Sequence, residues 1–377
     1  MSTFATNTST TCALEATTTD APAPKAAKTT PTMTILDGGM GHLLRRNGVE
    51  VKGPIGSVER FLGVALANLD KPEIVTAAHD AYLAAGARVI ITNSYACIPG
   101  VVGDDRARVD ACVTAAGELA RAVAAKYDGA LVAGSLPPLR ASYRPDQVLE
   151  DAVLDAEYKH IAATIAPFCD ILICETMSCV REAAAAARAG AATGLPVWVS
   201  WSLQEDDRGA LLSGESVEDA VAALVKAGLL ESPPADGDDA PAAAAATGGG
   251  GGFAVEACLF NCSAPEAIDV ALPRLRACTS ARVRLGAYAN GFVTVRSPPP
   301  LEEPAKDQDD ETEEKPGAGW AKKNAPVSEY RADLTPEAYA ACAARWATAA
   351  GGGASLIGGC CGVFPEHIDE LAKQLLL

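Results

Sequence analysis

The stretch Gly353–Gly362, GASLIGGCCG, decides the fold class. It contains a short apolar run, Ser355–Gly359, which is typical of a strand buried in a parallel sheet. Working outward from this stretch, seven more apolar runs of similar length are found along the chain. They are Thr34–Leu36, Arg88–Thr92, Ala130–Gly134, Ile171–Cys174, Val197–Trp201, Ala257–Asn261 and Arg284–Tyr288.

Segments with apolar residues at helical spacing separate most of these runs. Two of them begin with a start signal: Ser216 stands three residues before Asp219, and Thr335 precedes Pro336 at a first helical position. Eight strands alternating with helices predict an α/β fold, a single-domain (β/α)8 TIM barrel, with a doubly wound sheet as the second choice. The helical segments include Pro72–Ala85, Arg106–Ala125, Gln147–Ala166, Val180–Ala192, Ser216–Ala227, Pro265–Ala277 and Thr335–Ala350.

The composition is that of a globular protein without a nucleic-acid partner. Of the 377 residues, 49% are hydrophobic, and the net charge of −17 offers no basic surface to a phosphate backbone. No apolar run reaches the roughly 18 residues of a membrane span, and the N-terminus lacks the pattern of a secretory signal. We therefore expect a cytoplasmic protein whose twelve cysteines are reduced. The sequence does not specify an oligomeric state.

Three segments of the chain are of low complexity. Residues 1–32 are rich in Thr, Ala and Ser, so we expect a disordered leader ahead of a barrel domain at 33–377. Organelle transit peptides share this bias, so targeting by the leader is the alternative to a cytoplasmic location, although the leader contains no Arg. Two further stretches, near 231–252 and 297–328, have the composition of solvated surface insertions, and the second contains a run of acidic residues.

Three cysteines fall where the predicted strands end. Cys262 follows the sixth apolar run, and Cys360 and Cys361 follow the eighth. In a (β/α)8 barrel the active site lies at the carboxyl ends of the strands, so these thiols converge there. Three thiolates with an open fourth position are typical of a catalytic zinc site, and the flanking glycines let adjacent cysteines turn toward one ion. The alternatives for the Cys-Cys pair are two buried thiols or a vicinal disulfide.

Zinc bound by three thiolates is a weak activator of water because the ligands already carry excess negative charge. A fourth soft ligand, such as a substrate thiol, suits it better. A free thiol has a pKa of about 8.5, so the metal would hold it as a thiolate near neutral pH. The sequence therefore predicts a substrate whose own sulfur is the nucleophile.

Several motifs make the chain similar to the homocysteine S-methyltransferase family. The resemblance runs from about Thr34 to Leu377, interrupted by the two insertions, and the GGCCG element paired with an upstream Asn-Cys is its most specific part. It implies a zinc-containing (β/α)8 barrel that transfers a methyl group to L-homocysteine, giving methionine. The motifs are LDGGMG at 36–41, ITNSY at 91–95, GSLPPLRASYRPD at 134–146, CETM at 174–177, FNCS at 260–263, YANG at 288–291 and GASLIGGCCG at 353–362.

The resemblance also implies roles for individual residues. Its zinc ligands are Cys262, Cys360 and Cys361. The homocysteine ammonium is expected on Asp37 and Glu175, and this agrees with the attraction of two acids for a cation. The carboxylate is expected on backbone N–H groups near Gly38 and Gly39, with Thr92 nearby. For Asp37 the alternative is a turn residue before the two glycines.

Other residues near the predicted strand ends have two interpretations each. Tyr95, Tyr288 and Asn290 either line the methyl-donor pocket or pack and cap loops. Trp201 either offers a cation–π face to the donor or belongs to the core, and the core is favoured. His42 either approaches the pocket or starts a helix, and the helix is favoured.

The methyl donor must be activated, because a methyl group leaves only from a sulfonium, a quaternary ammonium or a corrin-type carrier. The chain has no cobalamin and folate modules after the barrel, and no GxGxxG follows a strand. The order of preference is therefore S-methylmethionine, S-adenosylmethionine, then betaine. Gly56 replaces a tryptophan often found there in relatives, which bears on the donor. The alternatives are a non-catalytic zinc or thiol redox sensor and a barrel hydrolase that uses carboxylates.

Overall fold

All eight predicted strands are present in the computed structural model, which describes Met1 and residues 32–53, 57–233, 252–291 and 330–376. Each strand pairs in parallel with its neighbours in one eight-stranded sheet. The predicted leader and insertions lie almost entirely outside the described residues and stay predictions. The strands are β1 (Thr34–Ile35), β2 (Val89–Ile91), β3 (Leu131–Leu136), β4 (Ile171–Met177), β5 (Val197–Trp201), β6 (Val255–Asn261), β7 (Arg284–Ala289) and β8 (Leu356–Gly359).

The sheet closes on itself between the first two strands. Its order is β1-β8-β7-β6-β5-β4-β3-β2, and a parallel bridge between Leu36 and Val89 joins its two ends. The Arg88 N–H donates to Ile35 O at 2.7 Å and the Asp37 N–H to Val89 O at 3.0 Å, which completes the seam. The predicted (β/α)8 barrel is therefore confirmed, and the doubly wound sheet is excluded.

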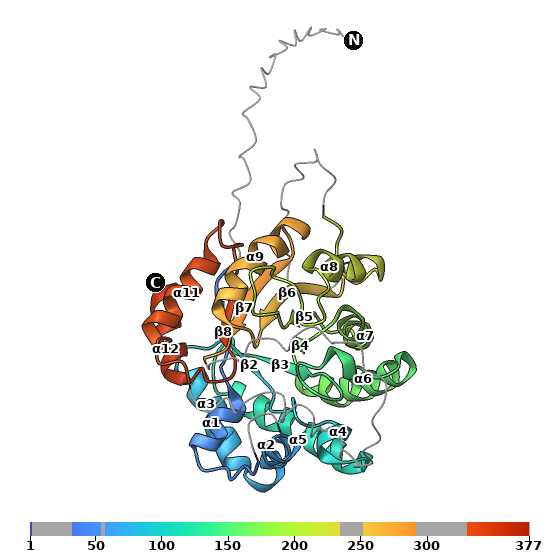
Figure 1. The fold of residues 1–377 in the computed structure, drawn as a ribbon, viewed down its shortest axis with the longest axis vertical. Coiled ribbons are helices and arrows are strands. Elements are labelled where there is room, and N and C mark those ends of the chain that lie inside the picture. The colour runs from blue at the N-terminus through green and yellow to red at the C-terminus, as the bar shows by residue number, and fades with distance from the viewer. Residues whose placement is uncertain (2–31, 54–56, 234–251, 292–329, 377) are drawn as a thin grey trace, which may run out of the picture. The chain divides into compact units, whose positions relative to one another are not determined.

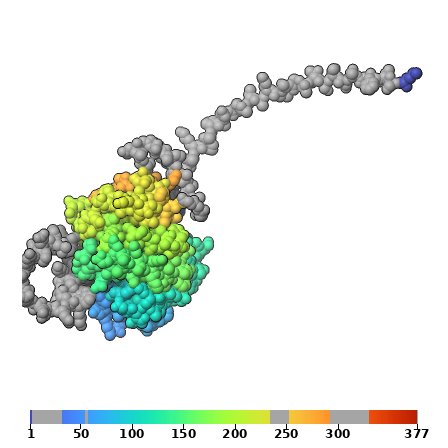
Figure 2. Space-filling view, turned by 90° about the vertical axis from the view of Figure 1, so that its right-hand side faces the viewer, coloured from blue at the N-terminus to red at the C-terminus, as the bar shows by residue number. Residues whose placement is uncertain are grey.

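Helices surround the strands (Figure 1), and α12 lies against α3, so the C-terminal part of the chain meets the N-terminal part. Successive segments appear as adjacent colour bands on the face drawn in Figure 2, as expected for repeated strand–helix units. The helices are α1 (Met40–Arg46), α2 (Val58–Asp70), α3 (Pro72–Ala84), α4 (Pro99–Val102), α5 (Arg106–Ala124), α6 (Asp151–Ile165), α7 (Val180–Ala191), α8 (Val217–Lys226), α9 (Pro265–Cys278), α11 (Pro336–Ala347) and α12 (Pro365–Leu375).

The predicted helix starts are made by the expected side chains. Ser216 Oγ accepts the Asp219 N–H at 3.0 Å, and Thr335 Oγ1 accepts the Ala338 N–H at 3.3 Å. Helix α6 begins later than predicted because a separate 3-10 turn occupies Pro145–Gln147. Helices α1, α2, α4 and α12 lie outside the predicted segments. None of the helices in the described parts of the chain is long and apolar enough to span a membrane.

Two apolar layers hold the barrel together. The larger lies between strands and helices, and the smaller is a group of ten buried residues that includes Trp198, Leu259 and Tyr288. The smaller group takes members from every strand or its immediate end, which is the packing that fills a barrel interior. The interior is therefore closed by side chains, and polar groups collect at the carboxyl ends of the strands.

Candidate active site

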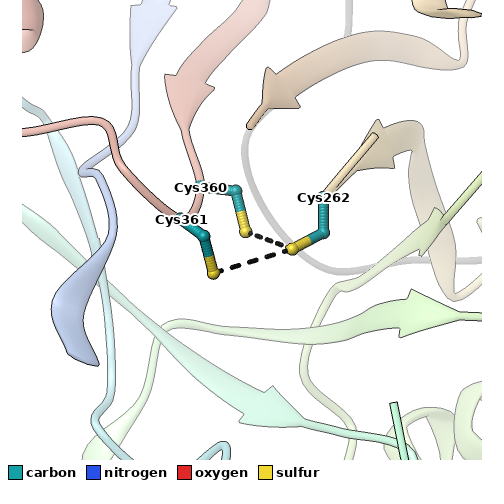
Figure 3. Close-up of side chains that lie close together, drawn as sticks. All are labelled: Cys262, Cys360 and Cys361. Carbon is teal, nitrogen blue, oxygen red and sulfur yellow. Dashed lines mark hydrogen bonds between the residues drawn. The ribbon is translucent and has the colours of Figure 1, made fainter. Parts of the chain in front are cut away.

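Three cysteine sulfurs meet at the carboxyl ends of β6 and β8 (Figure 3). Cys262 directly follows β6, and Cys360 and Cys361 directly follow β8. The Cys262 sulfur lies 3.0 Å from that of Cys360 and 3.9 Å from that of Cys361, and all three lie within 4.8 Å of one another. All three are free thiols, so Cys360 and Cys361 do not form a vicinal disulfide.

The spacing of these sulfurs fits a thiolate-bound metal. Zn–S bonds of about 2.3 Å in tetrahedral geometry put two sulfurs about 3.8 Å apart. The 3.9 Å pair matches this distance, and the 3.0 Å pair is a hydrogen-bonded contact that must widen by about 0.8 Å around an ion. The donor set, three soft sulfur ligands, is the one that suits zinc.

Close approach of two backbone segments fixes the positions of these cysteines. The Cys360 N–H donates to Ala289 O at 2.9 Å, and the Gly291 N–H donates to Cys361 O at 2.7 Å. A Cβ at Gly291 would lie 2.7 Å from Gly362 O, so this contact requires glycine. Cys262 itself has φ 50°, a left-handed conformation that is strained for any residue with a side chain.

Tyr143 contacts the cluster directly, although the sequence pattern did not predict a role for it. Its hydroxyl donates to the Cys262 sulfur at 2.6 Å, and its own φ is 63°. Hydrogen bonds with Cys360, Cys361 and Tyr143 lower the pKa of the Cys262 thiol well below its usual range. The signal in the sequence was the GSLPPLRASYRPD motif, which contains Tyr143 but does not show that it reaches a thiol 119 residues away.

Asn261 joins three strand ends beneath Cys262. Its Oδ1 accepts from the Thr176 N–H and from Ser200 Oγ, both at 2.8 Å, and its Nδ2 donates to Thr176 Oγ1 at 2.8 Å. Thr176 also has a left-handed backbone, with φ 61°. The buried amide therefore holds two strained residues, Thr176 and Cys262, beside each other.

Glu175 lies within β4, where the register with β5 shifts between Cys174 and Met177. Such an irregularity redirects side chains. The carboxylate is buried and accepts from Ser135 Oγ at 2.5 Å, while the Tyr288 hydroxyl lies 3.5 Å away. Burial raises the pKa of Glu175 to about 7, against the effect of the Ser135 hydrogen bond.

Thr92 supports this arrangement from β2. Its Oγ1 accepts the Ser135 N–H at 3.1 Å and lies 2.8 Å from Ser94 Oγ. Ser135 in turn donates to Glu175. Thr92 therefore positions the serine that holds the carboxylate.

Asp37 is the second buried carboxylate at this end of the barrel. Its Oδ2 accepts the Ile91 N–H at 2.8 Å, so it strengthens the seam between β1 and β2. Burial is the main cause that raises its pKa well above the usual range, and the charge of Glu175 adds to it. Neither carboxylate forms an ion pair within the described part of the chain.

Gly38 and Gly39 pack against the loop that carries Cys360 and Cys361. A Cβ at Gly38 would lie 2.5 Å from Val363 O, and one at Gly39 would lie 2.6 Å from Cys360 O. The Gly39 N–H donates to Val363 O at 2.9 Å. For the Gly38 N–H, no partner is found among the described residues.

Comparison with known proteins shows to which family the chain belongs. The sequence profile of homocysteine S-methyltransferase matches residues 34–375. The chain belongs to the homocysteine S-methyltransferase family. It is 25% identical over 361 residues to the homocysteine S-methyltransferase YbgG of Bacillus subtilis, covering 90% of this chain and 93% of that protein.

Solved structures agree on the fold of this methyltransferase. The metallated form of the Escherichia coli homocysteine methyltransferase MmuM superposes with a TM-score of 0.64 at 24% identity, covering 91% of this chain and 96% of that one. The oxidized form gives 0.63 at the same identity and coverage. The family match, and not the shared fold, makes the chain a methyltransferase that acts on homocysteine, so the hydrolase and the non-catalytic alternatives are wrong.

Three further residues of this homocysteine S-methyltransferase had two interpretations each, and they lie either in the core or near the site. Trp201 is buried in the larger core, as favoured. The Tyr95 hydroxyl bonds to Ser142 Oγ at 2.6 Å, and burial, with a smaller effect of the charge of Cys262, raises the pKa of Tyr95 well above the usual range. His42 stands in the first turn of α1, and its Nδ1 lies 3.1 Å from the Tyr330 hydroxyl.

Asn290 and Gly56 are the last two residues for which the sequence suggested a role. The buried Asn290 amide has no hydrogen-bond partner within the described residues, which fits a polar group reserved for a ligand. Gly56 lies outside the described residues, so its effect on the donor stays a prediction.

Proposed function

We propose that this methyltransferase transfers a methyl group from S-methylmethionine to the thiol of L-homocysteine, with one zinc ion held by Cys262, Cys360 and Cys361. The observation that carries the proposal is the convergence of three sulfurs within 4.8 Å beside two buried carboxylates. MmuM, which shares the fold, has been solved in a metallated form. Bound zinc would supply the positive charge that keeps the homocysteine sulfur ionised near neutral pH.

The protein's own residues orient the amino acid. Glu175 and Asp37 receive the homocysteine ammonium, because two buried carboxylates without an ion-pair partner among the described residues attract a cation. The Gly38 N–H is the better candidate for the substrate carboxylate, since the Gly39 N–H is already bonded to Val363 O. The sulfur and the amine are thus held at two separate points, which fixes the length of the substrate.

Tyr143 and Asn261 complete the site. The Tyr143 hydroxyl donates to the Cys262 sulfur and so stabilises its ionised form. Asn261 holds Thr176, next to Glu175, against the backbone that carries Cys262. The metal ligand Cys262 and the ammonium ligand Glu175 are therefore positioned by hydrogen bonds of the same asparagine.

The donor assay tests the proposal. Purified protein is incubated with zinc, L-homocysteine and, in turn, S-methylmethionine, S-adenosylmethionine or betaine, while methionine is measured. We expect the fastest turnover with S-methylmethionine and then with S-adenosylmethionine. Cysteine, one methylene shorter, is the matched control and should not be methylated. A preference for betaine would replace the proposed donor, and turnover unchanged by metal removal would contradict the zinc site.

A further inference from the structure

Two tyrosine side chains from the outer helices reach the metal loop, residues 358–363, which contains Cys360 and Cys361. Tyr82 lies on α3 and Tyr339 on α11, and both side chains are fully buried. A buried hydroxyl is costly unless it is hydrogen-bonded. The partners of these two hydroxyls are backbone groups at opposite ends of the metal loop. The loop is therefore held from outside the barrel at both ends.

Tyr339 holds the end at which the loop leaves β8. Its hydroxyl donates to Gly358 O at 2.7 Å and accepts the Ala289 N–H at 2.9 Å. Strands β7 and β8 are paired as far as Ala289 and Gly359, so the hydroxyl is inserted between their last residues. The Cys360 N–H donates to the carbonyl oxygen of the same Ala289 at 2.9 Å. Tyr339 thus sets the spacing of the two strands exactly where Cys360 begins.

The Tyr339 ring is fixed by two aromatic neighbours. Its centroid lies 6.1 Å from that of Trp346 and 6.1 Å from that of His367, with interplanar angles of 86° and 89°. Such edge-to-face contacts are a favourable arrangement of rings. His367 in turn accepts the Phe364 N–H on Nδ1 at 3.2 Å, at the start of α12. The position of the Tyr339 hydroxyl is therefore determined by the packing of α11 and α12.

Tyr82 holds the other end of the metal loop. Its hydroxyl donates to Val363 O at 3.2 Å, and the same carbonyl accepts the Gly39 N–H at 2.9 Å. The Val363 N–H donates to Cys360 O at 3.0 Å, which closes the turn of the loop. A Cβ at Gly38 would lie 2.8 Å from Tyr82 Cε1, so the ring packs directly on this glycine. Tyr82 therefore joins the metal loop to the two glycines proposed to face the substrate carboxylate.

We propose that Tyr82 and Tyr339 are positioning residues that hold the two ends of the metal loop in the geometry needed to bind the metal. The inference rests on the proposed function, because it takes the three cysteines to be zinc ligands. Three glycines make the loop conformationally permissive, and ordering such a segment costs conformational entropy. A loop that two hydroxyls already hold in place leaves less to be ordered when the ion binds, so its affinity is higher.

The two tyrosines differ in what else they contact, and this separates their effects. The Tyr339 hydroxyl bonds to the ends of β7 and β8, which carry the metal loop and its neighbour. Tyr82 contacts both the metal loop and Gly38. Loss of the Tyr339 hydroxyl should therefore weaken zinc binding alone, whereas loss of the Tyr82 hydroxyl should weaken the binding of both zinc and homocysteine.

The test uses Tyr82→Phe and Tyr339→Phe, which remove the hydroxyl and keep the ring. Chelator competition measures the zinc Kd, which we expect to rise by about 10- to 100-fold in each variant, the usual effect of removing a group that supports metal ligands. At saturating zinc, the homocysteine KM should rise by about 3- to 10-fold in Tyr82→Phe, the size expected for one neutral hydrogen bond. It should not change in Tyr339→Phe.

The absorption spectrum of the Co²⁺-loaded protein gives a second readout. Thiolate-to-cobalt bands depend on the geometry of the ligands, so they should change in both variants even at saturating cobalt. Tyr127→Phe is the matched control: its hydroxyl bonds to Asp80 Oδ1 at 3.0 Å, ahead of β3 at the opposite end of the barrel. This variant should keep the zinc Kd and the cobalt spectrum of the wild type. Thermal melts of the zinc-free proteins check that all three variants fold.

The outcomes separate this inference from the proposed function. An unchanged zinc Kd and cobalt spectrum in a folded Tyr82→Phe or Tyr339→Phe variant would overturn the positioning role of that tyrosine. An equal loss of zinc affinity in Tyr127→Phe would show a general effect of stability and would overturn the inference for both. In each of these cases the wild type still binds one zinc ion. A wild-type protein that binds no zinc would overturn the proposed function as well.

Discussion

Cys258 and Cys262 stand four residues apart on and just after β6, and their chemistry is opposite. Cys258 lies inside the strand, where burial raises the pKa of its thiol far above the usual range. Cys262 is also buried, yet hydrogen bonds with Cys360, Cys361 and Tyr143 lower its pKa. The partners found at a strand end, and not burial itself, make a thiol able to ionise and bind metal.

The strongest test of this contrast is to remove each thiol in turn. Cys262→Ala should abolish methyl transfer and bound zinc, because two sulfurs cannot complete the ligand set. Cys258→Ala should keep both and lose roughly 1 kcal/mol of stability, the usual effect of a small core truncation. Metal analysis and turnover of the two purified variants measure the difference. Full zinc occupancy in a Cys360→Ala, Cys361→Ala double variant would show that the metal assignment is wrong.

The second test addresses the hydrogen bonds that Asn261 makes beside Cys262, at the end of β6. Asn261→Ala removes the hydrogen bonds that hold left-handed Thr176 next to Cys262, and each such conformation costs about 1–3 kcal/mol. Small misplacements of reacting groups reduce rates by about 100-fold, so we expect a loss of that size in kcat with weaker zinc binding. Chelator competition and kinetics measure both.

Ser202→Ala is the matched control for Asn261→Ala. It removes one hydrogen bond to the Asn261 backbone carbonyl and leaves the amide in place. Its kcat and zinc affinity should stay within a few-fold of the wild type. Equal behaviour of the two variants would mean that the Asn261 amide does not position the site.

The sequence predicted the parts of the site that follow directly from strand ends. Eight apolar runs locate the barrel, and the barrel brings Cys262 to Cys360 and Cys361 across about a hundred residues. It did not predict Tyr143, because this residue reaches the site from a loop whose path depends on tertiary packing. Periodicity also could not show that a buried amide, Asn261, holds two strained residues.

The sequence also did not predict two hydrogen bonds to backbone groups near the end of β1. Asp37 has a structural contact, to the Ile91 N–H, besides its predicted role. The Gly39 N–H is taken by Val363 O. Both follow from how the short strand β1 closes the barrel, which the residue pattern does not specify.

The third test concerns the anchors for the substrate amine. Glu175→Gln should raise the homocysteine KM by about 10- to 100-fold, because a lost contact to a charged group costs roughly 1.5–3 kcal/mol. Asp37→Asn should act in the same direction and also weaken the seam at Ile91. Zinc content should not change in either variant. Unchanged kinetics in both would mean that these carboxylates are structural and that the proposed substrate orientation is wrong.

The smallest effect is on stability, and its sign follows from the pKa of Glu175. Burial raises this pKa from 4.5 to about 7, so the folded protein holds the proton more tightly than the unfolded chain. The stabilisation is complete below about pH 4.5 and is lost as the pH rises to 7. It amounts to at most about 3 kcal/mol, or roughly 4 °C in Tm for a domain of this size.

Glu175→Gln removes this titration. Without homocysteine, the variant should therefore gain Tm relative to the wild type between pH 5 and pH 8, while its substrate affinity falls. Added homocysteine should raise the Tm of the wild type at pH 8 more than that of the variant, since an ammonium beside Glu175 favours its ionised form. Thermal melts at several pH values, with and without homocysteine, measure both differences. Parallel curves for the two proteins would mean that Glu175 ionises as freely as a carboxylate in water, and that the strand end does not hold it ready for a cation.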